Sequence, residues 1–199
     1  MCVLLSPPRS QMTMQETVAR LRTFLAALQE RPDIQVTKLE IGDPAKPADL
    51  LAHPDMPEEL RLFYNEMNGL HLKWSFVEGG GGADLEIMSI HEKRPRKWMM
   101  EYESELHFGK PYVSWVLALQ MEYSYRMVRH LRRTTFEILF HGPDGGEEAD
   151  KVSDSVQQLL ELGMKNGFCD YWPSCFQPNP TLDYSMFEKA IRRFQGVEE

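Results

Sequence analysis

Residues 56–76 read MPEELRLFYNEMNGLHLKWSF, and the spacing of their apolar side chains changes partway along. In the first half, apolar residues recur at every third or fourth position, as on one face of a helix. From Leu70 to Phe76 every second residue is apolar or aromatic, which predicts a strand with one buried face. Asn68-Gly69 stands between the two patterns and suits a helix end. The stretch predicts a helix followed directly by a half-buried strand.

Before this stretch, Asp55 suits the N-cap of the same helix, and Pro57 suits its first turn because a missing N–H costs little there. Further upstream, Thr13 and Glu16 have the spacing of a capping box for a helix from about Met14 to Glu30. Alternation then predicts a strand from Ile34 to Ile41. Three prolines predict a loop over Gly42 to Pro54.

After this stretch, four glycines at Gly79 to Gly82 predict a hairpin turn into a second strand. Seven successive odd-numbered positions from Trp115 to Met127 are apolar or aromatic, so we expect them on one face of one strand, or of two strands broken by a turn or bulge. Other expected elements are a short helix near Trp98 to Leu106, a strand over Phe136 to Phe140, a helix over Asp154 to Lys165, a packed loop over Asp170 to Pro180 and a last helix over Asp183 to Phe194.

This order of elements predicts an α+β fold, in which helices flank an antiparallel β-sheet. The chain has 199 residues, 42% of them hydrophobic, which suits a globular protein with its own core. We expect a single domain over residues 1–199. Residues 1–12 are expected to form a flexible N-terminus, and residues 170–199 a C-terminal extension with an added helix.

The net charge of −8 argues against broad binding to nucleic acid or to an anionic membrane, since both would repel the chain. Basic residues near Arg94 and Arg132 could form a local positive patch, but no nucleic-acid motif accompanies them. The N-terminal apolar run is too short for a signal sequence or a membrane span. Three cysteines form no disulfide framework, so we expect a cytoplasmic protein from a reducing compartment.

The stretch 56–76 resembles the start of a SUKH-superfamily domain, of the Smi/Knr type. In that family a proline opens a helix, an apolar stripe follows, an Asn-Gly pair ends the helix, and the next strand carries an aromatic residue. The order of a glycine-rich hairpin, a strand meander and a late helix is also similar. The positions that match the motif are Pro57, Leu60, Phe63, Tyr64, Asn68, Gly69 and Trp74.

The resemblance implies a non-catalytic binding protein, most specifically a bacterial immunity protein that occludes the active site of a cognate toxin. Fungal relatives act as regulatory scaffolds, and that alternative stays open. No cofactor and no metal is implied. The partner would be a protein toxin with a basic contact surface, since charge complementarity speeds association and favours the right partner. The oligomeric state is not predicted.

The negative charge lies mostly in one part of the chain. Residues 134–199 carry 12 acidic and 5 basic side chains, whereas residues 1–133 carry 18 and 17. Five of the acids stand close together in and after a glycine-rich turn, where they could contact a partner or simply be solvated at a helix N-terminus. This acidic set, the predicted partner-binding surface, consists of Asp144, Glu147, Glu148, Asp150 and Asp154.

A hydrolase or transferase whose site assembles only in three dimensions is the alternative from another class. Cys169 or Cys175 could pair with His141, but no catalytic signature surrounds either cysteine. The six histidines form no H-x-x-x-H spacing, and Gly79 to Gly82 lack the Lys-Ser/Thr of a phosphate-binding loop. No pair of carboxylates stands in a context that predicts a raised pKa. We therefore predict no catalytic residue.

Overall fold

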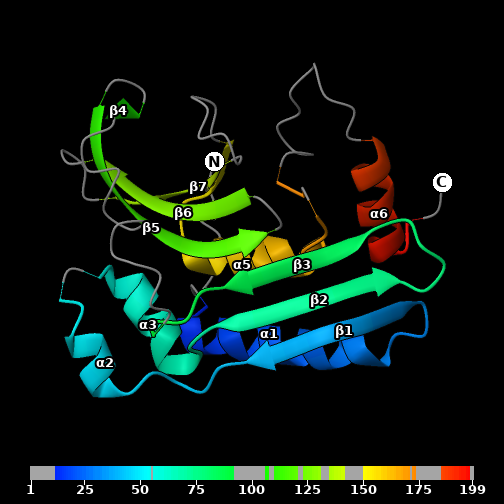
Figure 1. Ribbon diagram of the computed structural model, residues 1–199, viewed down its shortest axis with the longest axis horizontal. Helices are drawn as coiled ribbons and strands as arrows, with labels where there is room; N and C mark the ends of the chain where they lie inside the picture. Colours follow the sequence, from blue (N-terminus) through cyan, green and yellow to red (C-terminus); the bar gives the residue numbers. More distant parts are fainter. Residues whose placement is uncertain are drawn as a thin grey trace, which may run out of the picture.

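The computed structural model describes residues 12–54, 56–91, 106–107, 110–120, 123–130, 135–141, 150–170, 172–173 and 185–197. Its fold is α+β, as predicted, with helices packed on an antiparallel sheet (Figure 1). The described helices are α1 (Met14–Glu30), α2 (Pro47–Leu51), α3 (Glu58–Glu66), α5 (Val156–Lys165) and α6 (Ser185–Gln195). The described strands are β1 (Ile34–Ile41), β2 (Leu70–Phe76), β3 (Gly82–Ile87), β4 (Leu106–His107), β5 (Lys110–Gln120), β6 (Tyr123–His130), β7 (Glu137–His141) and β8 (Asp150–Ser153).

The sheet follows the chain as a meander. Within the described residues its strand order is β1-β2-β3-β5-β6-β7-β8, and the short β4 pairs with β5. Every neighbouring pair is antiparallel. Each strand thus pairs with a strand close to it in sequence, as tight turns and short connections allow.

One face of the sheet is covered by helices. Figure 1 shows α1 and α5 behind the strands, and α6 beside the turn that joins β2 to β3. The buried face of β2 consists of Leu70, Leu72, Trp74 and Phe76, and it packs in one hydrophobic cluster with the apolar stripe of α1. Burial of these side chains supplies the main driving force for the fold.

The first helix and first hairpin agree with the sequence. In α1, the Thr13 hydroxyl accepts from the amide of Glu16, and the Glu16 carboxylate accepts from the amide of Thr13, which completes the capping box. The predicted bounds of α1, β1 and β2 match the observed ones. The glycine turn joins β2 to β3 as a hairpin. These elements show their period over enough residues for sequence alone to identify them.

The loop predicted over Gly42 to Pro54 is wrong in its middle, because α2 forms there. Arg61 of α3 explains its stability, since its guanidinium donates to the carbonyls of Leu50 and His53 at the end of α2. Both carbonyls also accept from backbone amides, those of His53 and Met56, so the guanidinium adds a link between α3 and the end of α2. Next, α3 begins at Glu58 with Pro57 as its N-cap, two residues later than predicted, and Asp55 lies outside the described residues.

The prediction that one face carries all the odd-numbered residues from Trp115 to Met127 is wrong for part of β5. The register between β5 and β6 shifts between Val116 and Ala118, which marks a β-bulge. A bulge inserts one residue and reverses the alternation beyond it. Ala118 and Gln120 are therefore buried, while Leu119 is only partly so. The polar residue Gln120 enters the core as a result.

Several expected elements end differently or lie elsewhere. Strand β8 precedes α5 and was not predicted, and Ser155 caps α5 through its hydroxyl. Leu106 lies in β4, while the rest of the helix expected from Trp98 lies outside the described residues. Most of the loop expected over Asp170 to Pro180 and the segment expected to be flexible, apart from residue 12, also lie outside them. Helix α6 confirms the last predicted helix.

Candidate functional site

A buried polar network joins the end of β5 to the turn that follows α5. Gln120 is 1% exposed, and its Nε2 donates to the carbonyls of Phe168 and Cys169 at 2.7 and 3.1 Å. Its Oε1 accepts from the hydroxyl of Tyr125 on β6. Because buried polar groups must find partners, one glutamine satisfies two carbonyls and a hydroxyl at once. The network anchors the turn after α5 to the sheet.

Asp170 takes the place of a strand where β5 ends. Among the described residues, the part of β3 before Leu85 has no pairing partner on β5, and Asp170 supplies one. Its amide donates to the Gly82 carbonyl at 2.9 Å, and its Oδ1 accepts from the Asp84 amide at 3.2 Å. The same oxygen lies 3.3 Å from Gln120 Nε2. The carboxylate thus closes an open sheet edge.

Burial gives two groups of this network raised pKa values. Burial raises the pKa of Asp170, although the Asp84 amide and Gln120 act in the opposite direction. Burial also raises the pKa of the Tyr125 hydroxyl well above its usual value. The prediction that no carboxylate pair stands in such a context is therefore wrong, because Asp84 and Asp170 have pKa values shifted in opposite directions.

The pKa of Asp84 is shifted in the opposite direction because Lys73 and His71 on β2 form hydrogen bonds with its carboxylate. Partial burial pushes its pKa upward, but hydrogen bonds from Lys73 and His71 outweigh burial and leave the pKa below its usual value. Lys73 Nζ lies 2.7 Å from Asp84 Oδ2, and His71 Nε2 lies 3.2 Å from Oδ1. These are cross-strand pairs between β2 and β3, of a kind that stabilises sheets.

Glu59 of α3 is a third acidic group with a raised pKa, and it lies at the start of α5. Burial raises the pKa of Glu59 on α3, while amides at the start of α5 act against the shift. Glu59 Oε1 accepts from the Gln157 amide at 3.0 Å. An acidic side chain at a helix N-terminus satisfies free amides and opposes the helix dipole. Glu59 therefore connects α3 to α5.

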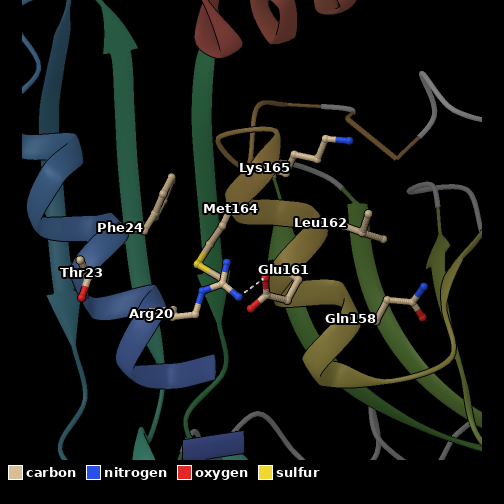
Figure 2. A pocket seen from close by; sticks show the side chains of 8 residues that line it. All are labelled: Arg20, Thr23, Phe24, Gln158, Glu161, Leu162, Met164 and Lys165. Carbon is tan, nitrogen blue, oxygen red and sulfur yellow. Dashed lines mark ion pairs between the residues drawn. The ribbon is translucent and has the colours of Figure 1, made fainter. Parts of the chain in front are cut away.

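The larger of two described hollows is an open groove of about 720 Å³ between α1 and α5. Figure 2 shows Arg20 of α1 reaching across to Glu161 of α5, with Met164 above this ion pair and Phe24 further along α1. The pair spans 3.0 Å. Glu161 Oε1 is buried and has no hydrogen-bond partner among the described residues. The lining residues are Arg20, Thr23, Phe24, Gln158, Glu161, Leu162, Met164 and Lys165.

The smaller hollow holds about 140 Å³ on the other side of α5. It shares Leu162 and Lys165 with the groove and is closed by Trp172 and Pro173. Neither hollow is lined by any described group whose pKa is raised, which are Glu59, Lys73, Tyr125 and Asp170. The shifted groups therefore hold elements together, and the groove is lined by residues of α1 and α5.

The structure describes only part of the acidic set. Asp154 is exposed at the start of α5, and its carboxylate lies 2.6 Å from Lys151 Nζ. Asp150 opens β8, and its side chain is outside the described atoms. Asp144, Glu147 and Glu148 lie outside the described residues. Asp154 therefore combines exposure with a local ion pair, and sequence alone gave no sign of that pair.

The motif residues from 56–76 have structural contacts. Leu60, Phe63 and Tyr64 are buried in the core, with Pro57 as the N-cap of their helix. Asn68 Oδ1 accepts from the Ile90 amide at 2.7 Å, which fixes the chain after β3. Gly69 has φ +99°, a conformation that favours glycine. Trp74 Nε1 donates to the Gly167 carbonyl at 3.0 Å and so ties β2 to the turn after α5.

The described residues give little support to the cysteine–histidine pair or to a metal site. Cys169 is fully buried, as expected for a packed side chain, and Cys175 and the side chain of His141 are not described. In the described part of the chain, no three His, Cys, Asp or Glu side chains converge as metal ligands would. Among the described helices, none has both the length and the apolar character that a bilayer span requires.

Comparison with known proteins returned no match, whether to a family model, to a curated protein or to a solved structure.

Proposed function

We propose that this chain is a non-catalytic binding protein, and that its partner is a cognate protein toxin whose active site it covers, as an immunity protein does. One observation carries the non-catalytic part. Each described group with a raised pKa is held by hydrogen bonds that join elements of the fold, and none lines a described hollow. A catalytic acid or base is expected to face a cavity that admits substrate.

Charge supports a basic partner. The chain carries a net charge of −8, and most of the excess follows residue 133. At the start of α5, Asp154 is 70% exposed on its side chain and adjoins the rest of the acidic set in sequence. A nuclease toxin presents a basic cleft to its substrate, so an acidic surface would both attract and cover it. The resemblance to the SUKH superfamily favours the same function.

Co-expression tests this proposal. Each member of a panel of bacterial nuclease toxin domains is expressed with the chain, and survival is scored for toxins that kill when expressed alone. The test variant reverses four charges of the acidic set: Asp144→Lys, Glu147→Lys, Glu148→Lys and Asp150→Lys. The control variant reverses four exposed acids elsewhere: Glu30→Lys, Glu40→Lys, Glu78→Lys and Glu188→Lys.

We expect the unmodified chain and the control variant to rescue growth, and the test variant to lose rescue. The two variants have the same net charge, so a difference between them locates the interface. Rescue by both variants would show that the acidic set is not the contact surface. If the unmodified chain neither rescues growth nor binds any toxin of the panel in calorimetry, the immunity function is contradicted.

A further inference from the structure

Strand β1 forms one edge of the sheet. Figure 1 shows it as the outermost strand on that side, with α1 behind it. Among the described residues β2 is the one strand that pairs with β1, so the other side of β1 carries no ladder. A strand edge of this kind presents backbone N–H and C=O groups that can pair with another chain. The edge of β1 is therefore a surface to which a further strand can add.

The ladder between β1 and β2 shows which backbone groups face outward. Directly after β1, the Gly42 amide donates to the Gly69 carbonyl at 2.9 Å, so these two opposed residues form a hydrogen-bonded pair. Hydrogen-bonded and non-hydrogen-bonded pairs alternate along an antiparallel ladder. Counting back from Gly42, Leu39 and Ile41 belong to non-hydrogen-bonded pairs. Their N–H and C=O groups point away from β2, toward the open edge, where no described residue bonds to them.

The side chains along this edge are apolar on one face of the sheet and charged on the other. Val36, Leu39 and Ile41 pack against the hydrophobic core and are only partly buried. Lys38 and Glu40 lie on the opposite face, with side chains 39% and 71% exposed. A strand added here would cover the apolar residues and would face one base and one acid.

We propose that β1 pairs with β1 of a second copy in antiparallel orientation, about a two-fold axis at Leu39. The Leu39 N–H of each copy then donates to the Leu39 carbonyl of the other, as the outward direction of these groups allows. Lys38 of each copy lies opposite Glu40 of the other. An axis at Lys38 or at Glu40 would instead place like charges opposite each other, which destabilises a sheet.

Charge complementarity favours a second copy over an unrelated strand. Lys38 lies opposite Lys73 in the ladder with β2, although Lys73 is itself paired with Asp84. A carboxylate on the other side of Lys38 would offset this like-charge neighbour. Glu40 of a second copy supplies that carboxylate, and the two-fold axis makes the contact twice.

The β-bulge in β1 limits how far this pairing extends. The register with β2 shifts between Val36 and Lys38, which leaves a short regular stretch around Leu39. Bulges and lysines on edge strands are common devices against unlimited edge pairing. A two-fold contact uses the same edge of both copies, so the assembly closes as a dimer. The proposal does not rest on the immunity function, because no residue of the acidic set lies in β1.

Charge exchange in the full chain tests the proposal. Lys38→Glu and Glu40→Lys, each alone, would place like charges opposite each other in the dimer. An equimolar mixture of the two single variants restores opposite charges, and so does the double variant. Glu30→Lys is the matched control, since it makes the same charge change at the exposed end of α1. Sedimentation velocity over a range of concentrations measures self-association, and thermal melting confirms that each variant folds.

We expect the parent, the control and the double variant to form dimers as concentration rises. Each single variant should associate more weakly by about ten-fold or more, and the mixture should form a heterodimer. A parent chain that stays monomeric at every concentration would overturn the proposal and leave the edge to a strand of another protein. Single variants that dimerise as well as the parent, or a mixture that stays monomeric, would also overturn it.

Hydrogen exchange in the parent chain tests the position of the interface without any substitution. We expect the Leu39 amide to exchange several-fold more slowly as the protein concentration rises. The amides of β8, at the other end of the strand order, should not change. Protection of β8 in place of β1 would put the contact at the wrong edge and contradict the proposal.

Discussion

Replacing Gln120 by leucine should cause a large loss of stability, although the two side chains are similar in size. Gln120 is the buried polar residue that the β5 bulge turns inward. Leucine would fill the same space and would supply no hydrogen bonds. The carbonyls of Phe168 and Cys169 would lose their shared donor, and the Tyr125 hydroxyl would lose its acceptor.

Each buried polar group left without a partner costs about 1–3 kcal/mol, and burial of the leucine methyl groups recovers part of this. The Cys169 carbonyl keeps the Trp172 amide as a donor. With the Phe168 carbonyl and the Tyr125 hydroxyl losing their partner, we expect Gln120→Leu to lower the free energy of unfolding by about 2–4 kcal/mol. For a chain of this length, 1 kcal/mol corresponds to about 2–4 °C in Tm, so the expected fall is on the order of 10 °C. Urea unfolding followed by circular dichroism measures the first quantity, and calorimetry the second.

Tyr125→Phe is the matched variant, since it removes only the hydroxyl that donates to Gln120. Alone, it should cost about 1–2 kcal/mol, because the Gln120 oxygen loses a donor. In the Gln120→Leu background the same change should cost much less, which gives a coupling between the two sites. A loss below about 1 kcal/mol for Gln120→Leu, or purely additive losses, would refute the reasoning about this network.

Two further predictions concern the same turn after α5. The pKa of Asp170 is raised in the folded chain, so stability falls as pH rises from the ordinary aspartate pKa through the folded one. Asp170→Asn keeps an acceptor oxygen, so it should unfold no earlier than the parent at pH 7 and should remove that slope from a plot of Tm against pH. An unchanged slope would contradict the assignment of the raised pKa to Asp170. Gly163→Ala puts a Cβ 2.0 Å from the Phe168 ring, so calorimetry should show a loss of stability of about 1–3 kcal/mol. The loss should be smaller when Phe168 is also changed to leucine. Equal losses in both backgrounds would exclude a clash between the new Cβ and the ring.

Much of the fold follows from the sequence because its signals are local. The capping box of Thr13 and Glu16 and the stripe of α1 lie within a few turns of one helix, and they predict its bounds. The alternation from Leu70 to Phe76 likewise predicts β2 and its buried face. In each case one periodicity runs without interruption for at least seven residues. Neighbouring strands then pair in chain order, so the local elements also define most of the sheet.

What the sequence does not predict depends on contacts between distant residues. The β5 bulge leaves no local signal, yet it decides that Gln120 faces the core and Leu119 does not. The end of α2 accepts a hydrogen bond from Arg61, which lies 11 residues after the carbonyl it binds. The raised pKa of Asp170 requires a turn placed against a strand 86 residues earlier. Residue type and spacing cannot indicate such burial, which only the folded chain creates.

The residues that carry the SUKH resemblance have roles in the fold, and they do not determine which partner the chain binds. Leu60, Phe63 and Trp74 are buried, and Gly69 needs its positive φ, so each has a packing or backbone reason to be present. A motif of this kind constrains the fold and leaves the outer surface free to vary. Partner choice must then depend on residues outside 56–76. The acidic set lies outside this stretch, so the co-expression experiment tests function independently of the resemblance.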